Sequence, residues 1–361
     1  MEERLNNLSR WLEQEGHDLA FIHSTHNVFY LTGFWCEPHE RLLGLIVSPA
    51  NDPILLCPMM EKNRVLQGGW PHQVVGYSDT DNPWTLLGQA MGIRAASLAV
   101  EKDALSLARA EQLRLLFPDT SFADAGLQLD MVRSVKDHLE IEALREAGRQ
   151  ADEAIRAGVS ALEEGISELE VAAILELTMK RKGVSRMSFP TAVLFGEKAA
   201  NPHGETGARK LQAGDLVLFD LGVVWKGYCS DITRTVAFGS VTDKQRTVYE
   251  TVRQANQAAL AATRPGVRMG DIDLAARRVI DQAGFGQYFT HRVGHGLGLG
   301  VHEYPSVHQN NDQLLKEGMV FTIEPGIYLD GQMGVRIEDD VVVTRDGVEV
   351  LTNYPKELQV I

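Results

Sequence analysis

The stretch LVLFDLGVVWKGYCSDITRTV, residues 216–236, contains two apolar runs joined by a short Trp-Lys-Gly segment. This pattern predicts a β-hairpin. A turn at residues 225–226 would place Asp220 opposite Asp231, and a turn at residues 226–227 would place them nearly opposite. We therefore expect the two aspartates on one face of the hairpin, about 5 Å apart at Cβ.

A second stretch, MVFTIEPGIYLDGQMGVRIEDDVVV at residues 319–343, has the same pattern. A turn centred on Gly331 would place Glu324 opposite Glu338. Facing carboxylates repel each other, so each pair must share a proton, have basic partners or bind cations. Two such pairs favour cations, because carboxylates that bridge two divalent ions are typical of two-metal hydrolases. An ordinary surface role with Arg or Lys partners remains open at this point.

A weak internal repeat connects the two hairpins. Gly165 begins the lead-in to a helical run that stops at Gly183, and Gly266 and Gly284 flank a similar run 101 residues later. Glycines at such positions are typical of helix ends. Chance similarity between two amphipathic helices is the alternative, but a hairpin with two carboxylates follows each run. The repeat therefore predicts a pseudo-twofold internal duplication.

The stretch HRVGHGLGLGVHE, residues 291–303, contains three of the chain's 11 histidines. Its glycines alternate and do not follow the G-x-G-x-x-G order, which argues against a dinucleotide site. Alternating glycines also disfavour a helix and predict an extended segment where backbone approaches a ligand or another strand. Any one of these histidines could be an ordinary buried side chain, but three together indicate a functional site.

The first 120 or so residues predict a small α/β domain. Leucines recur at helical spacing in residues 5–12, and apolar runs at 19–22, 42–47 and 53–57 predict strands. A long helical pattern follows at about residues 136–162. We place the domain boundary between residues 128 and 129, which gives domains of 1–128 and 129–361.

Composition limits the possible partners and location. The net charge of −14 argues against a general affinity for nucleic acid or anionic lipid, since both require a basic face. No apolar run is long enough to span a membrane, and the first residues do not resemble a signal peptide, so we expect a cytoplasmic protein with no membrane partner. Three scattered cysteines predict reduced thiols and no disulfide framework.

Taken together, these motifs resemble the creatinase-like, or pita-bread, metallopeptidase family, in its branch of Xaa-Pro aminopeptidases and prolidases. The resemblance covers most of the chain, and its motifs stand in the family's order. The stretches that carry it are residues 27–34, 220–222, 227–234, 291–303, 322–328 and 334–339.

The resemblance implies an α+β protein, with a small α/β N-terminal domain followed by a pita-bread domain. It implies that Asp220 chelates one metal ion, that His295 and Glu324 hold another, and that Asp231 and Glu338 bridge the two. An oxygen-rich ligand set with one imidazole suits Mn²⁺ best and also tolerates Co²⁺ or Zn²⁺.

The resemblance also implies a mechanism, in which two divalent ions present a hydroxide that attacks the scissile carbonyl. His203 and His302 would stabilise the tetrahedral intermediate or shuttle protons, and Glu324 would help to move a proton. His291 matches the position that accepts proline after the cleaved bond. Arg336 shares a strand face with Glu338, so we assign it to substrate binding, where it orients that ligand or neutralises part of the site.

One position departs from the family pattern. Prolidases restricted to dipeptides usually carry an arginine shortly after the His-Glu pair, to hold the substrate's C-terminal carboxylate, and Ser306 stands here. The sequence therefore favours an Xaa-Pro aminopeptidase that acts on peptides with proline in second position. An Xaa-Pro dipeptidase is the alternative, with Arg41 as one candidate for the carboxylate.

Other functions of the family are less consistent with the motifs. Methionine aminopeptidases generally lack this N-terminal domain, and creatinases lack an intact ligand set. A non-catalytic binding relative would also be expected to have lost ligands. As family members are often oligomers, we expect a homodimer.

Overall fold

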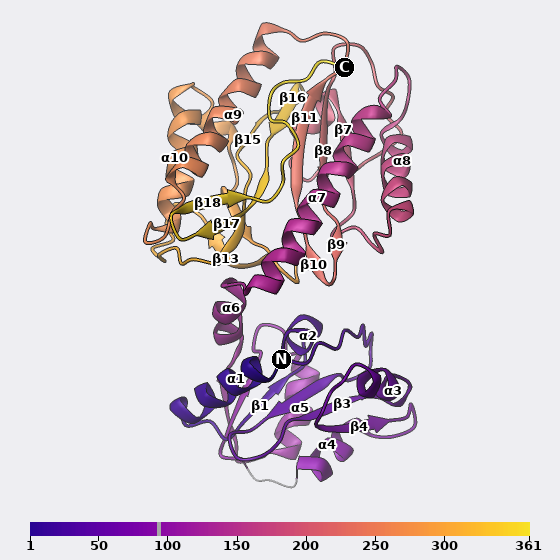
Figure 1. Cartoon of the computed structure of the whole chain (residues 1–361), viewed down its shortest axis with the longest axis vertical. Helices are drawn as coiled ribbons and strands as arrows, with labels where there is room; N and C mark the ends of the chain where they lie inside the picture. Colours follow the sequence, from indigo (N-terminus) through magenta and orange to yellow (C-terminus); the bar gives the residue numbers. More distant parts are fainter. Residues whose placement is uncertain (92–94) are drawn as a thin grey trace. The chain divides into compact units, whose positions relative to one another are not determined.

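The computed structural model describes residues 1–91 and 95–361. They form two compact units, Met1–Asp130 and Met131–Ile361 (Figure 1). The boundary predicted between residues 128 and 129 lies within helix α6 (Gly126–Ser134), and its position stays a prediction. In the part of the chain that is described, no helix is both long and apolar enough to cross a membrane.

The first unit is built on a six-stranded mixed sheet, in the order β4-β3-β2-β1-β5-β6. The three strands predicted from apolar runs are present, although β2 begins two residues later than expected. The strands are β1 (Leu19–Ile22), β2 (Gly44–Val47), β3 (Ile54–Pro58), β4 (Gln73–Tyr77), β5 (Ser97–Val100) and β6 (Ser121–Asp124). The helices are α1 (Glu2–Glu15), α2 (Thr25–Thr32), α3 (Met59–Gln67), α4 (Pro83–Met91) and α5 (Leu107–Leu116).

The second unit combines helices with a three-stranded sheet, β11-β8-β7, and a five-stranded sheet, β13-β12-β14-β17-β18. In Figure 1, α7 lies beside α8 and α9 beside α10. The helices are α7 (His138–Ser160), α8 (Glu168–Arg181), η1 (Gly196–Ala200), α9 (Asp243–Ala262), α10 (Met269–Gln282) and η2 (Gly286–Tyr288). The strands are β7 (Ala192–Phe195), β8 (Leu216–Leu221), β9 (Val224–Trp225), β10 (Tyr228–Cys229), β11 (Ile232–Ala237), β12 (Gly294–Gly296), β13 (Glu303–Val307), β14 (Val320–Ile323), β15 (Gly326–Leu329), β16 (Met333–Arg336), β17 (Asp339–Thr344) and β18 (Gly347–Val350).

The predicted duplication is present in this unit. Helix α10 begins and ends 101 residues after α8, and the glycines after both helices have positive φ, 90° at Gly183 and 84° at Gly284. The glycine before each helix donates its N–H to a leucine carbonyl at 2.9 Å, Leu211 in the first half and Leu315 in the second. The fold is thus α+β with a pseudo-twofold repeat, in which residues 138–237 form the first half and residues 243–350 the second.

Close packing explains a glycine inside α7. A Cβ added at Gly148 would lie 2.5 Å from the carbonyl oxygen of Leu351, so any larger residue would displace the backbone. The helix begins with a capping box between Asp137 and Glu140, which provides partners for the first free N–H groups. The helix predicted at about residues 136–162 is thus present and agrees to within two residues at each end.

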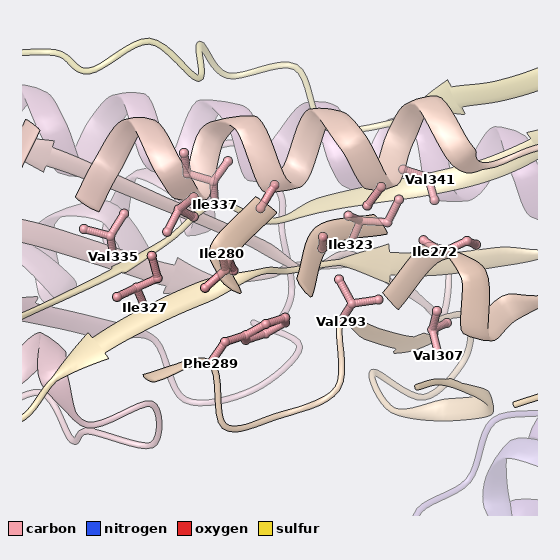
Figure 2. Close-up of a cluster of buried hydrophobic side chains, with 14 of the residues drawn as sticks. Ile272, Ile280, Phe289, Val293, Val307, Ile323, Ile327, Val335, Ile337 and Val341 are labelled. Carbon is pink, nitrogen blue, oxygen red and sulfur yellow. The ribbon is translucent and has the colours of Figure 1, made fainter. Parts of the chain in front are cut away.

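The second half has its own apolar core (Figure 2). Ile272 and Ile280 of α10 pack with strand residues such as Ile323 and Val341, and all four are fully buried. Each such side chain contributes about 1.5–3 kcal/mol relative to an exposed position. The core fixes β14 and β17, which flank Glu324 and Glu338.

The two halves meet where β11 lies beside β16 and β17, and we call this boundary the seam. The N–H of Glu338 donates to the carbonyl of Thr233 at 3.0 Å, and the N–H of Asp231 donates to Asp340 Oδ2 at 2.9 Å. The buried side chain of Arg234 forms an ion pair with Asp339 at 2.7 Å. These contacts bring the acidic hairpins of both halves together.

Candidate metal centre

The strand registers decide how the carboxylates face each other. In the first hairpin Trp225 pairs with Tyr228, so the turn is at residues 226–227 and Asp220 lies opposite Thr233. Asp231 is therefore displaced by two residues from Asp220, which is the second of the two arrangements expected from the sequence.

In the second hairpin the turn is centred on Gly331, as expected. Gly326 pairs with Arg336, and Ile323 pairs with Asp339. Glu324 and Glu338 lie between these two pairs, so the same register places them opposite each other.

A cavity of about 530 Å³ collects every residue assigned to the site from the sequence. The predicted metal ligands in its wall are Asp220, Asp231, His295, Glu324 and Glu338. The other predicted site residues in its wall are His203, His291, His302 and Arg336. The geometry places them together, and their roles stay predictions.

Three ligand atoms lie close enough to bind one ion. Asp231, His295 and Glu338 each place one donor atom within 4.8 Å of the others, and all three residues are at most 5% exposed. The Nδ1 of His295 donates to the carbonyl of Gly296 at 3.2 Å. The lone pair of Nε2 is thereby directed toward the carboxylates, 3.7 Å from Asp231 Oδ2 and 3.5 Å from Glu324 Oε1.

The electrostatics of this group favour a bound cation. Burial, with the charges of Glu338 and Asp220, raises the pKa of Asp231 well above its usual value. Burial also raises the pKa of Glu324 to about 7 and lowers that of His295 to about 3. Two like charges 4 Å apart repel by about 4 kcal/mol at an effective dielectric constant of about 20.

Among the predicted ligand atoms, Asp231 Oδ1 is buried and accepts no hydrogen bond within the described residues. A crowded set of carboxylate oxygens with one neutral imidazole nitrogen fits the preferences of divalent ions such as Mn²⁺. The residues present therefore fit a divalent metal centre.

Arg336 connects the two hairpins. Its Nη2 forms an ion pair with Asp220, and its Nε donates to Thr233 Oγ1 at 2.9 Å. The Thr233 hydroxyl in turn donates to Glu338 Oε2 at 2.6 Å. Arg336 thus neutralises one carboxylate directly and helps to orient another through Thr233.

A hydrogen-bonded chain continues from Arg336 to His291. Nη1 of Arg336 donates to the hydroxyl of Tyr328 at 2.8 Å, and this hydroxyl lies 2.9 Å from Nε2 of His291. Nδ1 of His291 lies 2.7 Å from the carbonyl of Arg292 and must donate to it, so Nε2 accepts from Tyr328. Burial lowers the pKa of His291 to about 4, which keeps the ring neutral in this chain.

His203 and His302 are exposed residues that also line the cavity. The rings of His302 and His295 are 4.1 Å apart between centroids and nearly perpendicular. The segment with His302 is anchored by its neighbour Glu303, which forms ion pairs with Arg133 and Lys136. His203 lies in a turn, where its N–H donates to Asn201 Oδ1 at 3.1 Å.

Several residues around the ligands were not identified from the sequence. Tyr328 joins His291 to Arg336, Asp340 accepts from the backbone of Asp231, and Arg292 lines the cavity. Thr233 lies two residues after Asp231 and therefore on the same face at strand spacing, so its position could have been inferred. Arg41, considered as a carboxylate partner, belongs to the first unit and pairs with Asp79 at 2.8 Å.

Duplicated hairpins that gather carboxylates around the imidazole of His295 in one cavity are typical of a metal-dependent hydrolase. The model of metallopeptidase family M24 matches residues 142–345, and that of the creatinase/prolidase N-terminal domain matches residues 4–135. The chain belongs to metallopeptidase family M24, and it is an enzyme, a peptidase that uses divalent metal ions.

Similar proteins match this chain over nearly its whole length. A relative from Bacillus subtilis (strain 168), named "Putative dipeptidase YkvY", is 54% identical over 98% of this chain and 99% of its own length. The crystal structure of a dipeptidase from Pyrococcus horikoshii OT3 has a TM-score of 0.92 and 37% identity, covering 99% of this chain and 100% of that one. A prolidase from the same organism has a TM-score of 0.92 and 33% identity, with 99% of each chain covered.

Proposed function

We propose that this chain is an Xaa-Pro dipeptidase, which hydrolyses the bond between an N-terminal residue and a C-terminal proline. The observation that carries the proposal is the single cavity that unites the five acidic and imidazole ligands with His291. The names of the similar proteins support a dipeptidase, and we therefore prefer it to the Xaa-Pro aminopeptidase favoured by Ser306. The aminopeptidase is the second candidate.

The five residues would provide a ligand set for two divalent ions, which we propose to be Mn²⁺. Asp220 would hold one ion, His295 and Glu324 the other, and Asp231 and Glu338 would bridge them. When bound, such ions polarise the scissile carbonyl and lower the pKa of a water molecule. The ion pair from Arg336 to Asp220 and the Thr233 hydroxyl on Glu338 keep the ligand carboxylates oriented.

The remaining residues would position the substrate and move protons. We assign His291 to the proline ring, because its neutral imidazole is flanked by the rings of Phe289 and Tyr328, 5.2 and 5.5 Å away. His203 and His302 would donate to the oxygen on which negative charge develops. Glu324 would transfer a proton to the leaving nitrogen.

Metal-dependent hydrolysis can be tested on protein freed of metal by chelation and then supplied with Mn²⁺, Co²⁺ or Zn²⁺. The substrates are Xaa-Pro dipeptides, Xaa-Pro-Yaa tripeptides and Met-Ala peptides. We expect Mn²⁺ to restore cleavage of Xaa-Pro dipeptides, with tripeptides cleaved at least 10-fold more slowly. Cleavage confined to non-proline peptides, or unaffected by chelation, would contradict the proposal, and faster cleavage of tripeptides would favour the aminopeptidase.

Two further properties belong to this proposal. We infer a homodimer from the resemblance described above, and we propose a cytoplasmic location. Light scattering coupled to size-exclusion chromatography measures the first, and fractionation of the source cells measures the second.

A further inference from the structure

The segment that carries His291 forms no helix or strand. It consists of residues 289–293, which connect η2 to β12. The imidazole of His291 lies between the rings of Phe289 and Tyr328, and its Nε2 is 2.9 Å from the hydroxyl of Tyr328. Without the regular hydrogen bonds of a helix or a sheet, the position of this imidazole depends on the side chains that contact the segment.

One arginine of α10 holds the backbone of this segment. Nη1 of Arg277 donates to the carbonyl of Phe289 at 3.0 Å, and Nη2 donates to the carbonyl of His291 at 2.6 Å. The guanidinium also lies over the ring of Phe289, 4.3 Å from its centroid. Because a guanidinium presents its N–H donors in a rigid planar fork, it can span two carbonyls at once. Arg277 therefore holds the main chain on both sides of Thr290.

A buried carboxylate orients the arginine. Asp273, one turn earlier in α10, is fully buried and accepts from Nε of Arg277 at 2.6 Å and from Nη2 at 3.2 Å. Oδ1 of Asp273 also accepts from the N–H of Val293 at 2.9 Å, and the carbonyl of Val293 accepts from the N–H of Glu324 at 2.7 Å. The pair thus fixes both ends of the segment and links it to a predicted metal ligand.

These contacts differ from those of an ordinary ion pair within a helix. Such pairs are usually exposed and contribute little to stability. Here one partner is fully buried, the arginine side chain is 23% exposed, and its donors reach the carbonyl of His291 itself. A shift of this carbonyl would move the imidazole away from the hydroxyl of Tyr328. The geometry therefore connects α10 to the orientation of one ring in the cavity wall.

We propose that Arg277 is a positioning residue for proline recognition, which holds the imidazole of His291 at the place where the proline ring of the substrate binds. The inference rests on the proposed function, because it assumes that His291 contacts proline. A positioning residue acts through another group. The loss of Arg277 should therefore affect the reaction only while His291 is present.

The experiment is a double-mutant cycle between these two residues. It measures kcat/KM for Ala-Pro with the Mn²⁺-loaded wild type, Arg277→Met, His291→Ala and the double variant. We expect Arg277→Met to lower kcat/KM by about 10- to 100-fold, because a small displacement of a substrate-positioning group has an effect of this size. The double variant should match His291→Ala within about twofold. Losses that multiply, or no loss in Arg277→Met, would overturn the inference.

Two further variants separate positioning from structural damage. Arg253 of α9 has a side chain that is 24% exposed and forms a bidentate pair with Glu250 of its own helix. Arg253→Met should change kcat/KM by less than about twofold, with or without His291. Arg277→Lys keeps the charge beside Asp273, but one ammonium does not span both carbonyls, so we expect a smaller loss of about 3- to 10-fold. It replaces Arg277→Met in the cycle if that variant does not fold.

The ring nitrogens of His291 provide a measurement that does not depend on turnover. The full chain is labelled with ¹⁵N-histidine and supplied with diamagnetic Zn²⁺, and the signals of His291 are identified by their absence from His291→Ala. We expect the tautomer protonated at Nδ1 in the wild type, and ring nitrogen shifts closer to the average of both tautomers in Arg277→Met. Arg253→Met should give the wild-type shifts.

The two measurements also distinguish this inference from the proposed function. If the loaded wild type cleaves no Xaa-Pro dipeptide, the proposed function fails, while the ring shifts still show whether Arg277 orients His291. The same shifts decide the question if His291→Ala is inactive. Unchanged ring shifts in Arg277→Met would overturn the inference.

Discussion

Single hydrogen bonds decide which atoms of the site face the cavity. The carbonyl of Gly296 fixes the His295 tautomer, and the carbonyl of Arg292 fixes that of His291. Each carbonyl belongs to the residue that follows its histidine, so the backbone itself orients the ring. The consequence differs between the two, because Nε2 of His295 faces carboxylates while Nε2 of His291 accepts from Tyr328.

The bridging role proposed for Asp231 gives a testable consequence. Burial and acidic neighbours raise the pKa of Asp231. Asp231→Asn removes this carboxylate, and an amide is a poor bridge between two cations. We expect the variant to lose most of its bound metal, measured by elemental analysis after dialysis against Mn²⁺. Asp330→Asn, on an exposed turn, is the control and should retain wild-type metal content. Retention of two ions per chain by Asp231→Asn would rule out the bridging role.

At the same scale, the sequence could point to those candidate site residues that belong to short motifs. The five acidic and imidazole residues stand in motifs with fixed spacing, so they could be named without coordinates. Tyr328 and Arg277 could not, because their roles depend on which groups lie across a strand or a cavity. Whether a side chain such as Arg277 reaches the backbone of His291 depends on tertiary register, which spacing alone does not determine.

Among the elements, the first hairpin shows the limit of a pattern. Alternation predicted its strands but left two turns possible. Lys226 and Gly227 both have positive φ, 50° and 90°, which is the geometry of a type I′ turn. Lysine rarely adopts positive φ, so the sequence did not favour this turn over its neighbour. In the second hairpin a glycine marks the turn, at Gly331, and the predicted register is correct.

Helix α8 provides a prediction about pH. Its capping box joins Ser167 to Glu170, and Lys210 lies 3.0 Å from the same carboxylate. The hydrogen bonds from Ser167 and the lysine lower the pKa of Glu170 from 4.5 to about 2. A lowered pKa means that the ionised carboxylate stabilises the fold above about pH 4.5 and that this contribution disappears as the pH falls toward 2.

The test compares Glu170→Gln with the wild type in thermal melts between pH 7 and the lowest pH at which both fold. We expect the variant to melt at a lower temperature at pH 7, and the difference to shrink below about pH 4.5. Glutamine can still complete the box, as Gln245 does at the start of α9, so the helix should form in both. A difference in melting temperature that is independent of pH would contradict the assignment.

At the scale of the whole unit, the seam depends on a buried ion pair between the two halves. Arg234 and Asp339 are at most 1% exposed, and Lys356 also reaches Asp339 at 2.7 Å. Arg234→Met leaves Lys356 as the cationic partner of Asp339 and removes the donors to the carbonyls of Glu338 and Tyr354. The loss of one partner of a buried pair costs about 3–5 kcal/mol. Arg234→Met should therefore lower the free energy of unfolding by about that amount.

Urea denaturation of the chelated protein measures this cost without a contribution from metal binding. The control is Arg145→Met, because Arg145 pairs with Glu349 at the surface and is about half exposed. An exposed pair of this kind is worth about 0–1 kcal/mol. Equal destabilisation by the two substitutions would show that the seam does not depend on Arg234.

The organisation of this unit was predictable because the same pattern of a helix followed by a hairpin occurs twice in the sequence. Helices α8 and α10, their glycines and the two hairpins all follow from periodicity and turn residues. The seam was not predictable, since the contacts of β11 with β17 join residues more than 100 positions apart. Local patterns carry no information on such pairings.

The duplication also bears on how the metal centre is assembled. One half of the second unit alone would carry a single hairpin with two carboxylates, too few to hold a pair of ions. Two copies related by a twofold axis would bring four carboxylates together, because a symmetric contact places the same patch of each copy against the other. In the present chain the two halves differ at this point, because the first half contributes only carboxylates to the predicted ligand set and the second half adds the imidazole of His295.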